Sequence, residues 1–80
     1  MNKRIVIYTK PDCSYCVDAK SVLKNNNIPF EEKTLDLDFT REYLLEEYTS
    51  AKTFPVIVVN EKYIGGYTEL VTDMNADFFN

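Results

Sequence analysis

The chain has 80 residues with a formal net charge of −4 at pH 7, and 45% of its residues are apolar and 14% aromatic. This length predicts one domain over residues 1–80, with a small core and no room for a second domain. The acidic balance excludes an extended basic surface, so we expect no nucleic-acid partner. No apolar stretch approaches the roughly 20 residues that span a bilayer, so we expect no membrane insertion.

The start of the sequence bears on where the protein works. Behind two basic residues, the apolar run reaches only from Ile5 to Tyr8, whereas a secretory signal needs an apolar region of about 7–15 residues. We therefore expect a cytoplasmic protein, in a compartment that keeps thiols reduced. The oligomeric state stays open, with a monomer as the default.

The first half of the chain contains two predicted strands with a helix between them. Arg4–Tyr8 is a nearly continuous apolar, β-branched run, typical of a strand that is covered on both faces. From about residue 14 to 26 the pattern becomes helical. Residues 30–37 alternate imperfectly, which predicts a strand at a partly exposed sheet edge. The buried face of the helix is expected to carry Cys16, Ala19, Val22 and Leu23.

The second half adds a helix, a hairpin and a last helix. Asp38 or Thr40 can cap a helix that reaches about Thr49. Pro55–Val59 is the strongest predicted strand, and a tight turn leads from it into an antiparallel partner. The last helix is expected to begin near Thr68. The residues expected to pack inward are Leu44, Leu45 and Tyr48 from the earlier helix and Leu70, Val71, Met74 and Phe78 from the last.

The order of these elements, β-α-β-α-β-β-α, predicts an α/β fold. The first two strands are joined through a helix and should be parallel, with a right-handed crossover. The last two strands should be antiparallel. We therefore expect a four-stranded mixed sheet flanked by helices.

The two cysteines of the chain, Cys13 and Cys16, stand where the first strand turns into the first helix. Such a pair, separated by two residues, is typical of a redox dithiol. Unpaired N–H groups and the dipole at a helix N-terminus stabilise a thiolate, so we expect a lowered pKa for Cys13 and assign it as the nucleophile. Cys16, one turn later and facing inward, should keep a pKa near or above that of a free thiol and resolve a mixed disulfide on Cys13.

Three other roles compete with a redox dithiol. A zinc site needs about four ligands, and the chain has no histidine and no second cysteine pair, so we expect no metal site. A purely structural disulfide would close a loop too small to stabilise the fold much. Two inert buried thiols would leave unexplained why they follow Lys10, Pro11 and Asp12 directly.

Three motifs, in this order, resemble the glutaredoxins, the small glutathione-using branch of the thioredoxin fold. Lys10–Cys16 is similar to the family's lysine followed by Cys-Pro-Tyr-Cys, Thr53–Pro55 to its Thr-Val-Pro, and Ile64–Leu70 to its Ile-Gly-Gly segment. The resemblance covers essentially the whole chain. It implies a thioredoxin-like fold and an enzyme that reduces protein disulfides and glutathione mixed disulfides, with glutathione as cosubstrate and no bound cofactor.

The resemblance also implies a substrate site around the second motif. Pro55 alone indicates only a strand boundary, where proline is common. In the family the peptide equivalent to Phe54–Pro55 is cis and faces the dithiol. The resemblance therefore implies that Thr53, Phe54 and Pro55 all belong to the substrate site. The free backbone groups of Phe54 could then pair with a cysteine-containing substrate.

Gly65 and Gly66, the only glycines, predict a turn that requires positive φ and a surface that a ligand can approach closely. The helix that follows has N–H groups able to hold a carboxylate, with Thr68 as a natural cap. The resemblance implies that Tyr67 and Thr68 receive the γ-glutamyl end of glutathione.

Two further residues acquire roles from the resemblance. Lys10 is by default a solvated lysine, but a cation beside the dithiol favours the Cys13 thiolate and could pair with the glycine carboxylate of glutathione. Arg41 or Lys52 could supply a second cation. Tyr15 could simply pack at the helix end, whereas the family role is a glutathione contact through its hydroxyl.

The sequence departs from the family pattern in three places. Thr68 and Glu69 stand in for a more acidic pair that is common in the family. Ser14 replaces the usual proline between the cysteines, and this residue influences the reduction potential. Phe54 replaces a smaller β-branched residue, which narrows the groove.

Glutathione and disulfide-containing proteins are the expected partners, with ribonucleotide reductase as a common client of the family. The alternatives are a redoxin reduced by thioredoxin reductase, a carrier that holds a [2Fe–2S] cluster through Cys13 and glutathione, and a non-catalytic adaptor. The second cysteine argues against the cluster carrier, and the intact motifs argue against the adaptor.

Overall fold

A computed structural model describes residues 4–51 and 53–75. The predicted order of elements is confirmed: β1 (Ile5–Thr9), α1 (Ser14–Asn25), β2 (Glu31–Thr34), α2 (Arg41–Glu47), β3 (Val56–Val59), β4 (Lys62–Gly65) and α3 (Tyr67–Asn75). The strands form one sheet in the order β2-β1-β3-β4. β1 runs parallel to β2 and antiparallel to β3, and β3 runs antiparallel to β4, so the predicted mixed sheet is confirmed.

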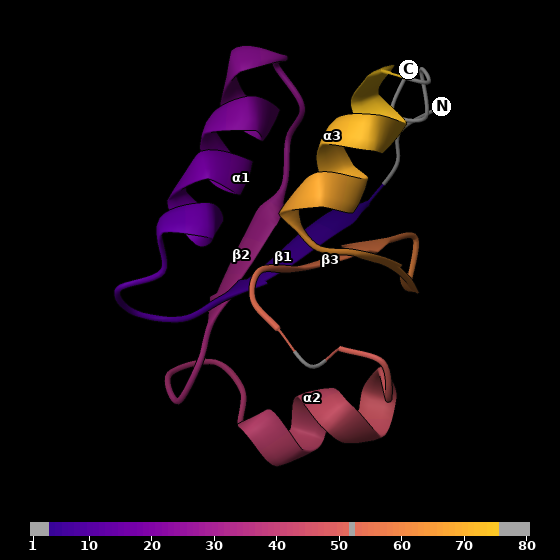
Figure 1. Ribbon diagram of the computed structural model, residues 1–80. Coiled ribbons are helices and arrows are strands. Elements are labelled where there is room, and N and C mark those ends of the chain that lie inside the picture. Colours follow the sequence, from indigo (N-terminus) through magenta and orange to yellow (C-terminus); the bar gives the residue numbers. More distant parts are fainter. Residues whose placement is uncertain (1–3, 52, 76–80) are drawn as a thin grey trace.

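The sheet separates two layers of helices, with α1 and α3 on one face and α2 on the other (Figure 1). Side chains of successive strand residues point to opposite faces, so β1 and β3 contribute to both cores. The core under α1 and α3 contains Ile5, Ile7, Ala19, Leu23, Ile57, Val59 and Leu70. The core under α2 contains Val6, Tyr8, Phe39, Leu44, Ala51, Val56 and Val58.

The central and edge strands lie where the sequence predicted them. Every residue of β1 is buried, whereas β2 is exposed or half-buried and lies at the edge of the sheet. β2 is shorter than the predicted 30–37 because the chain turns at Asp36, which has φ +66°. The backbone N–H of Thr34 donates to Oδ2 of Asp38 at 2.9 Å, which closes this turn.

α2 confirms the predicted cap at Thr40, whose Oγ1 accepts a hydrogen bond from the N–H of Tyr43 at 3.2 Å. The helix ends at Glu47 rather than near Thr49. Leu44 is buried, but Leu45 is 38% exposed, so its predicted burial was wrong. Adjacent residues point about 100° apart around a helix. The face of α2 that packs on the sheet therefore buries Leu44 but not Leu45.

α3 begins at Tyr67, one residue before the predicted start, so the predicted capping role of Thr68 was wrong. The cap position belongs to Gly66, whose N–H donates to Oε1 of Glu69 at 2.7 Å. A carboxylate three residues into a helix can satisfy the backbone in this way when the cap itself has no side chain. Leu70 is buried, as predicted, whereas Val71 is only half-buried. The packing of the Met74 side chain and of Phe78 lies outside the described residues.

Gly65 and Gly66 are constrained for different reasons. Gly65 has φ +132°, a backbone conformation that side chains rarely allow, which confirms the predicted positive φ. Gly66 does not have positive φ. A Cβ at Gly66 would lie 3.2 Å from the carbonyl oxygen of Pro55, so its constraint is close approach between two backbone segments. Within the described ranges, no helix is both long and apolar enough to cross a membrane.

Candidate active site

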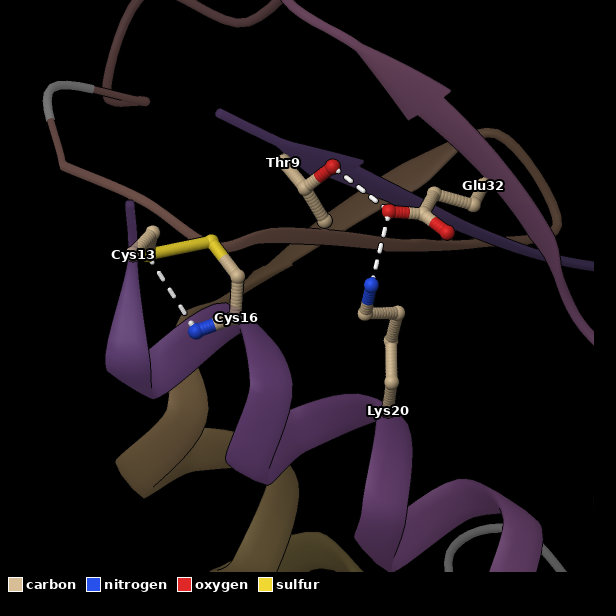
Figure 2. The surroundings of a disulfide bond; sticks show 5 residues. All are labelled: Thr9, Cys13, Cys16, Lys20 and Glu32. Carbon is tan, nitrogen blue, oxygen red and sulfur yellow. Dashed lines mark hydrogen bonds and ion pairs between the residues drawn. A yellow bond between two sulfur atoms is a disulfide. The ribbon is translucent and has the colours of Figure 1, made fainter. Parts of the chain in front are cut away.

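The two cysteines occupy the first turn of α1 and form a disulfide (Figure 2). Cys13 is the N-cap residue, and its Sγ accepts a hydrogen bond from the N–H of Cys16 at 3.2 Å. Cys13 is half-buried, whereas Cys16 is only 2% exposed. The geometry therefore agrees with an outer Cys13 at the helix start and an inner Cys16 on the packed face of α1.

The loop between β1 and α1 positions the first turn of α1, which carries the cysteine pair. β1 ends at Thr9, and Lys10 and Pro11 lead to Asp12, which has φ +58°. Aspartate tolerates this left-handed conformation better than most residues. The cysteine pair thus lies at the end of a fully buried central strand, where its position is set by the core.

We call the segment from Cys13 to Cys16 the redox turn. A groove beside it, which we call the aromatic groove, has a volume of about 370 Å³ and is lined by three distant parts of the chain. Seven of the eight predicted substrate-binding residues line it, and Lys10 is the exception. Its lining consists of Tyr15, Thr53, Phe54, Pro55, Gly66, Tyr67, Thr68 and Glu69. The rings of Tyr15 and Tyr67 face each other with centroids 5.7 Å apart, which joins the redox turn to the start of α3.

The Phe54–Pro55 peptide is cis, as the resemblance implied. It lies between the end of α2 and β3, and Gly66 packs against the Pro55 carbonyl from the other side. Thr53 is exposed, Phe54 is half-buried and Pro55 is buried. Pro55 therefore contributes little accessible surface, and Thr53 and Phe54 supply most of this wall of the groove.

Two cations converge on one ring at the edge of this groove. Lys10 Nζ lies 5.8 Å from the centroid of the Phe54 ring, and Arg41 Cζ lies 5.6 Å from the same centroid. Lys10 comes from the loop before α1, and Arg41 is the first residue of α2. Of the two predicted alternatives for a second cation, Arg41 is thus placed beside Phe54, whereas Lys52 lies outside the described residues.

A second groove flanks the disulfide itself, and we call it the polar groove. Its volume is about 670 Å³. It is lined by Thr9, Lys10, Pro11, Asp12, Cys13, Ser14, Cys16, Val17, Lys20, Glu32 and Thr34. Both cysteines line this groove, together with the end of β1, one face of α1 and the inner side of β2.

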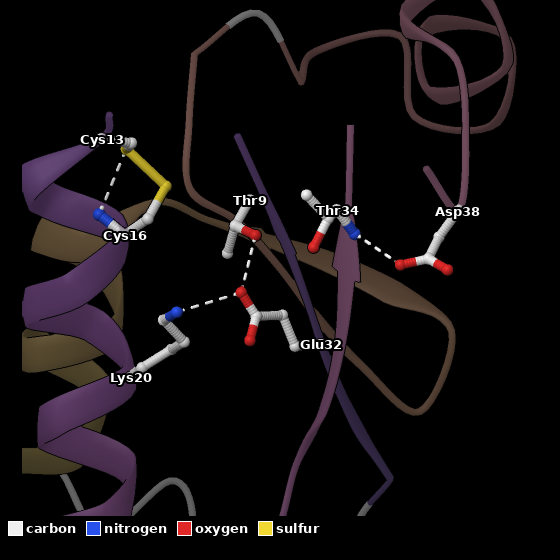
Figure 3. A network of polar contacts seen from close by, with 7 residues as sticks. All are labelled: Thr9, Cys13, Cys16, Lys20, Glu32, Thr34 and Asp38. Carbon is white, nitrogen blue, oxygen red and sulfur yellow. Dashed lines mark hydrogen bonds and ion pairs between the residues drawn. A yellow bond between two sulfur atoms is a disulfide. The ribbon is translucent and has the colours of Figure 1, made fainter. Parts of the chain in front are cut away.

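The polar groove contains a network that the sequence analysis missed (Figure 3). Oε2 of Glu32 accepts a hydrogen bond from the Thr9 hydroxyl at 2.8 Å and one from Lys20 Nζ at 3.0 Å. Thr9 is only 3% exposed. Buried polar side chains nearly always have a hydrogen-bond partner, and for Thr9 that partner is Glu32. The spacing in the sequence could have indicated the position of Lys20, because Lys20 follows Cys16 by four residues and therefore shares its helix face.

The network keeps Glu32 ionised. Burial raises the pKa of Glu32, but the hydrogen bonds from Thr9 and Lys20, with the positive charges of Lys20 and Lys24, outweigh burial and lower the pKa below its usual value of 4.5. A carboxylate and an ammonium therefore face each other in the groove that contains the disulfide. Among the described residues, no group of three or more His, Cys, Asp or Glu side chains is arranged to hold a metal ion.

Comparison with known proteins places this geometry in a family. A model of the glutaredoxin family matches residues 5–64. The chain is 35% identical over 71 residues to mitochondrial glutaredoxin-2 of Bos taurus, covering 85% of this chain and 45% of that protein. It is 30% identical over 66 residues to glutaredoxin 3 of Escherichia coli, covering 82% and 80% of the two chains. The chain thus spans less than half of the mammalian relatives that it matches.

Solved structures agree with these sequence matches. Glutaredoxin 1 from Francisella tularensis, solved with cacodylate, superposes with a TM-score of 0.79 at 29% identity, covering 98% of this chain and 99% of that one. A buckwheat glutaredoxin–glutathione complex superposes with a TM-score of 0.80 at 22% identity, covering 94% and 71%, and shows the shared fold. The predicted thioredoxin-like fold is thereby confirmed. Because the glutaredoxin family model matches more than half of the length of this chain, the chain belongs to the glutaredoxin family.

Proposed function

We propose that this chain is a glutathione-dependent dithiol–disulfide oxidoreductase that acts on protein disulfides and on glutathione mixed disulfides. The observation that carries this proposal is the redox pair Cys13–Cys16 at a helix N-terminus, bordered by a groove lined by seven predicted substrate-binding residues. The half-buried Cys13 is the nucleophile, and the buried Cys16 is the resolving thiol.

The proposed exchange proceeds in two steps. The Cys13 thiolate attacks one sulfur of the target disulfide, forms a new S–S bond and expels the other sulfur as a thiolate. When Cys13 carries glutathione, a second glutathione can attack the glutathione sulfur, which forms oxidised glutathione and expels the Cys13 thiolate. Alternatively, Cys16 attacks Cys13 Sγ and expels whichever thiolate was bound there. This second route leaves the Cys13–Cys16 disulfide, which two glutathione molecules reduce while they form oxidised glutathione. The helix start favours the ionised Cys13, because its Sγ accepts the N–H of Cys16.

The aromatic groove suits a short peptide with charged ends. Lys10 and Arg41 next to Phe54 offer positive charge for the glycine carboxylate. At the other end, the first N–H groups of α3 can hold the γ-glutamyl carboxylate, and Glu69 can pair with its ammonium group. The buckwheat glutaredoxin of the same fold was solved with glutathione, the ligand proposed here.

Two cysteine variants test the assignment of roles. Cys13→Ser should abolish glutathione-dependent reduction of a small disulfide, because no nucleophile remains at the helix start. Cys16→Ser should still remove glutathione from a glutathionylated protein, since that reaction needs only Cys13. If Cys16→Ser were inactive and Cys13→Ser active, the two roles would be reversed.

A coupled assay separates glutathione from the alternative electron source. NADPH oxidation should be fast with glutathione and glutathione reductase and slow with thioredoxin reductase. The opposite result would identify a redoxin that uses thioredoxin reductase. Titration with glutathione redox buffers, with the mixed disulfide followed by mass, would then give the reduction potential.

A further inference from the structure

The polar groove contains an ion pair on the side of α1 that carries the inner cysteine. Lys20 lies four residues after Cys16, so their Cβ atoms are about 5–6 Å apart on one helix face. Glu32 reaches the same groove from β2. Figure 3 shows the head groups of Lys20 and Glu32 between α1 and the sheet, on the same side as Cys16.

These charges are held in place by the fold. Lys20 Nζ and the Thr9 hydroxyl both donate to Oε2 of Glu32, and Thr9 is itself buried at the end of β1. The Lys20 and Glu32 side chains are 27% and 33% exposed, so solvent screens them only in part. A charge fixed this way acts on neighbouring groups more strongly than a mobile surface charge.

Cys16 is the group nearby whose charge changes during exchange. When a reducing thiolate attacks Cys13 Sγ, a new S–S bond forms there, the Cys13–Cys16 bond breaks, and its electron pair goes to Cys16 Sγ. The Cys16 thiolate then takes a proton from water. In the reverse direction it loses that proton, attacks Cys13 Sγ and expels the other thiolate. Because Cys16 is 2% exposed, water stabilises its thiolate poorly and fixed charges weigh more.

We propose that the Lys20–Glu32 pair sets the electrostatic environment of Cys16 when the disulfide opens, and thereby controls how readily Cys16 leaves and attacks again. The Lys20 ammonium stabilises the thiolate, the Glu32 carboxylate destabilises it, and their hydrogen bond keeps the two effects near balance. The proposal rests on the dithiol–disulfide exchange proposed above but holds for any reducing thiol. Both are positioning residues, because they act on the ionisation of Cys16 and not on a substrate.

Other charged groups around the redox turn are common to all the variants compared below. Lys10 and Asp12, in the loop before α1, line the polar groove as well. From α3, Tyr67 and Glu69 line the aromatic groove, and the Glu69 carboxylate is bound to the N–H of Gly66. Their influence on Cys16 therefore cancels when the variants are compared with one another.

The direct test measures the ionisation of Cys16 in a Cys13→Ser background, from the ultraviolet absorbance of the thiolate against pH and with no thiol substrate present. Lys20→Met should raise the pKa of Cys16, because the carboxylate is left without its cation. Glu32→Gln should lower it, because the ammonium is left without its anion. Each shift should be about half a unit to one unit, as expected for a partly screened charge near a buried thiol.

Opposite signs distinguish this role from a structural one, because both variants break the same ion pair. Lys20→Arg keeps the positive charge and should leave the pKa of Cys16 nearly unchanged. The matched control is Glu31→Gln on the same strand, which breaks an exposed ion pair with Arg4 at 3.2 Å. Glu31 does not line the polar groove, so this control should also leave Cys16 nearly unchanged.

A kinetic measurement in the dithiol protein gives a second readout. With Cys13 loaded with a small thiol as a mixed disulfide, the pH midpoint of its release by Cys16 should move down in Glu32→Gln and up in Lys20→Met. In a Cys16→Ser background, release by added thiol should respond less to either change, because the Cys13 thiolate then formed lies one helical turn farther from Lys20 than Cys16 does. The proposal is overturned if both variants shift Cys16 in the same direction, or by no more than Glu31→Gln does. A failed glutathione assay would instead contradict the proposed function and leave this titration intact.

Discussion

The two grooves that flank the redox turn are built in different ways. The aromatic groove is made by Tyr15 of α1, the loop before β3 and the start of α3, where the backbones of Pro55 and Gly66 approach closely. The polar groove is lined by the loop before α1 and by side chains of regular elements, and its ion pair joins Glu32 on β2 to Lys20 on α1. Its charges can be changed without disturbing the main chain, whereas the aromatic groove depends on the main-chain path itself.

This difference predicts how each groove responds to substitution. Changes at the backbone positions of the aromatic groove should reduce stability and ligand binding together. Changes in the polar groove should alter ionisation and leave the fold nearly as stable. The following variants test that contrast, beginning with the largest expected effect.

Gly65→Ala should destabilise the fold by about 2 kcal/mol, because alanine is strained at strongly positive φ. Gly65 has φ +132°, and its new Cβ would lie 2.7 Å from Cβ of Glu69. The midpoint of urea unfolding should fall. The KM for glutathione should rise because Gly65 directly precedes Gly66, which lines the aromatic groove. The matched change in the polar groove is Asp12→Gly at φ +58°, which should alter stability by less than about 1 kcal/mol. Equal losses in both variants would contradict the contrast.

Removing both cations beside Phe54, in Lys10→Ala/Arg41→Ala, should raise the KM for glutathione about tenfold, because each exposed charge pair contributes up to about 1 kcal/mol. The difference in KM from the parent protein should shrink as salt is added. Steady-state kinetics at two ionic strengths measure both effects. Lys24→Ala, in the last turn of α1, is the control for a general loss of positive charge. A KM that stays unchanged in the double variant would exclude these cations from binding.

Glu69→Ala should destabilise α3 by about 1 kcal/mol, because the N–H of Gly66 loses its acceptor at the helix start. Glu69→Gln keeps an oxygen in place and should recover part of this loss. Urea unfolding of the three proteins gives the comparison. An alanine variant as stable as the parent would mean that water replaces the carboxylate without loss.

The smallest effect concerns Glu32 and acid pH. Its pKa is lowered in the folded protein from the usual 4.5, so the carboxylate contributes stability above that pH and loses the contribution as pH falls through the folded value. Glu32→Gln should therefore flatten the acid side of the stability profile, by about 0.5 kcal/mol for a partly exposed ion pair. Urea unfolding at a series of pH values from neutral to about pH 3 measures the slope of the unfolding free energy against pH. An unchanged slope would show that the ion pair adds nothing to folding.

Local patterns predicted the secondary structure well and the ends of the helices less well. The apolar strands and the helix face of Cys16, Ala19 and Leu23 follow directly from side-chain periodicity. The burial of Leu45 and the capping role of Thr68 were wrong, because each depended on what packs against the helix. A threonine near a helix start suggests a cap, but α3 starts one residue earlier, and Gly66 takes the cap position with its N–H bound to Glu69.

The sequence by itself determined the nature of the redox turn, since Cys13, Cys16 and the helical pattern after them are local features. It also indicated seven residues that line one groove, although that indication came from resemblance and not from spacing. Only the tertiary structure decided which charged residues meet. Glu32 looked like one of several acidic residues on an edge strand, and Lys20 like an ordinary solvent-facing lysine. The parallel pairing of β1 with β2, under α1, brings Glu32 to Lys20, which lies one helical turn after the inner cysteine, because contacts between distant segments depend on the sheet order.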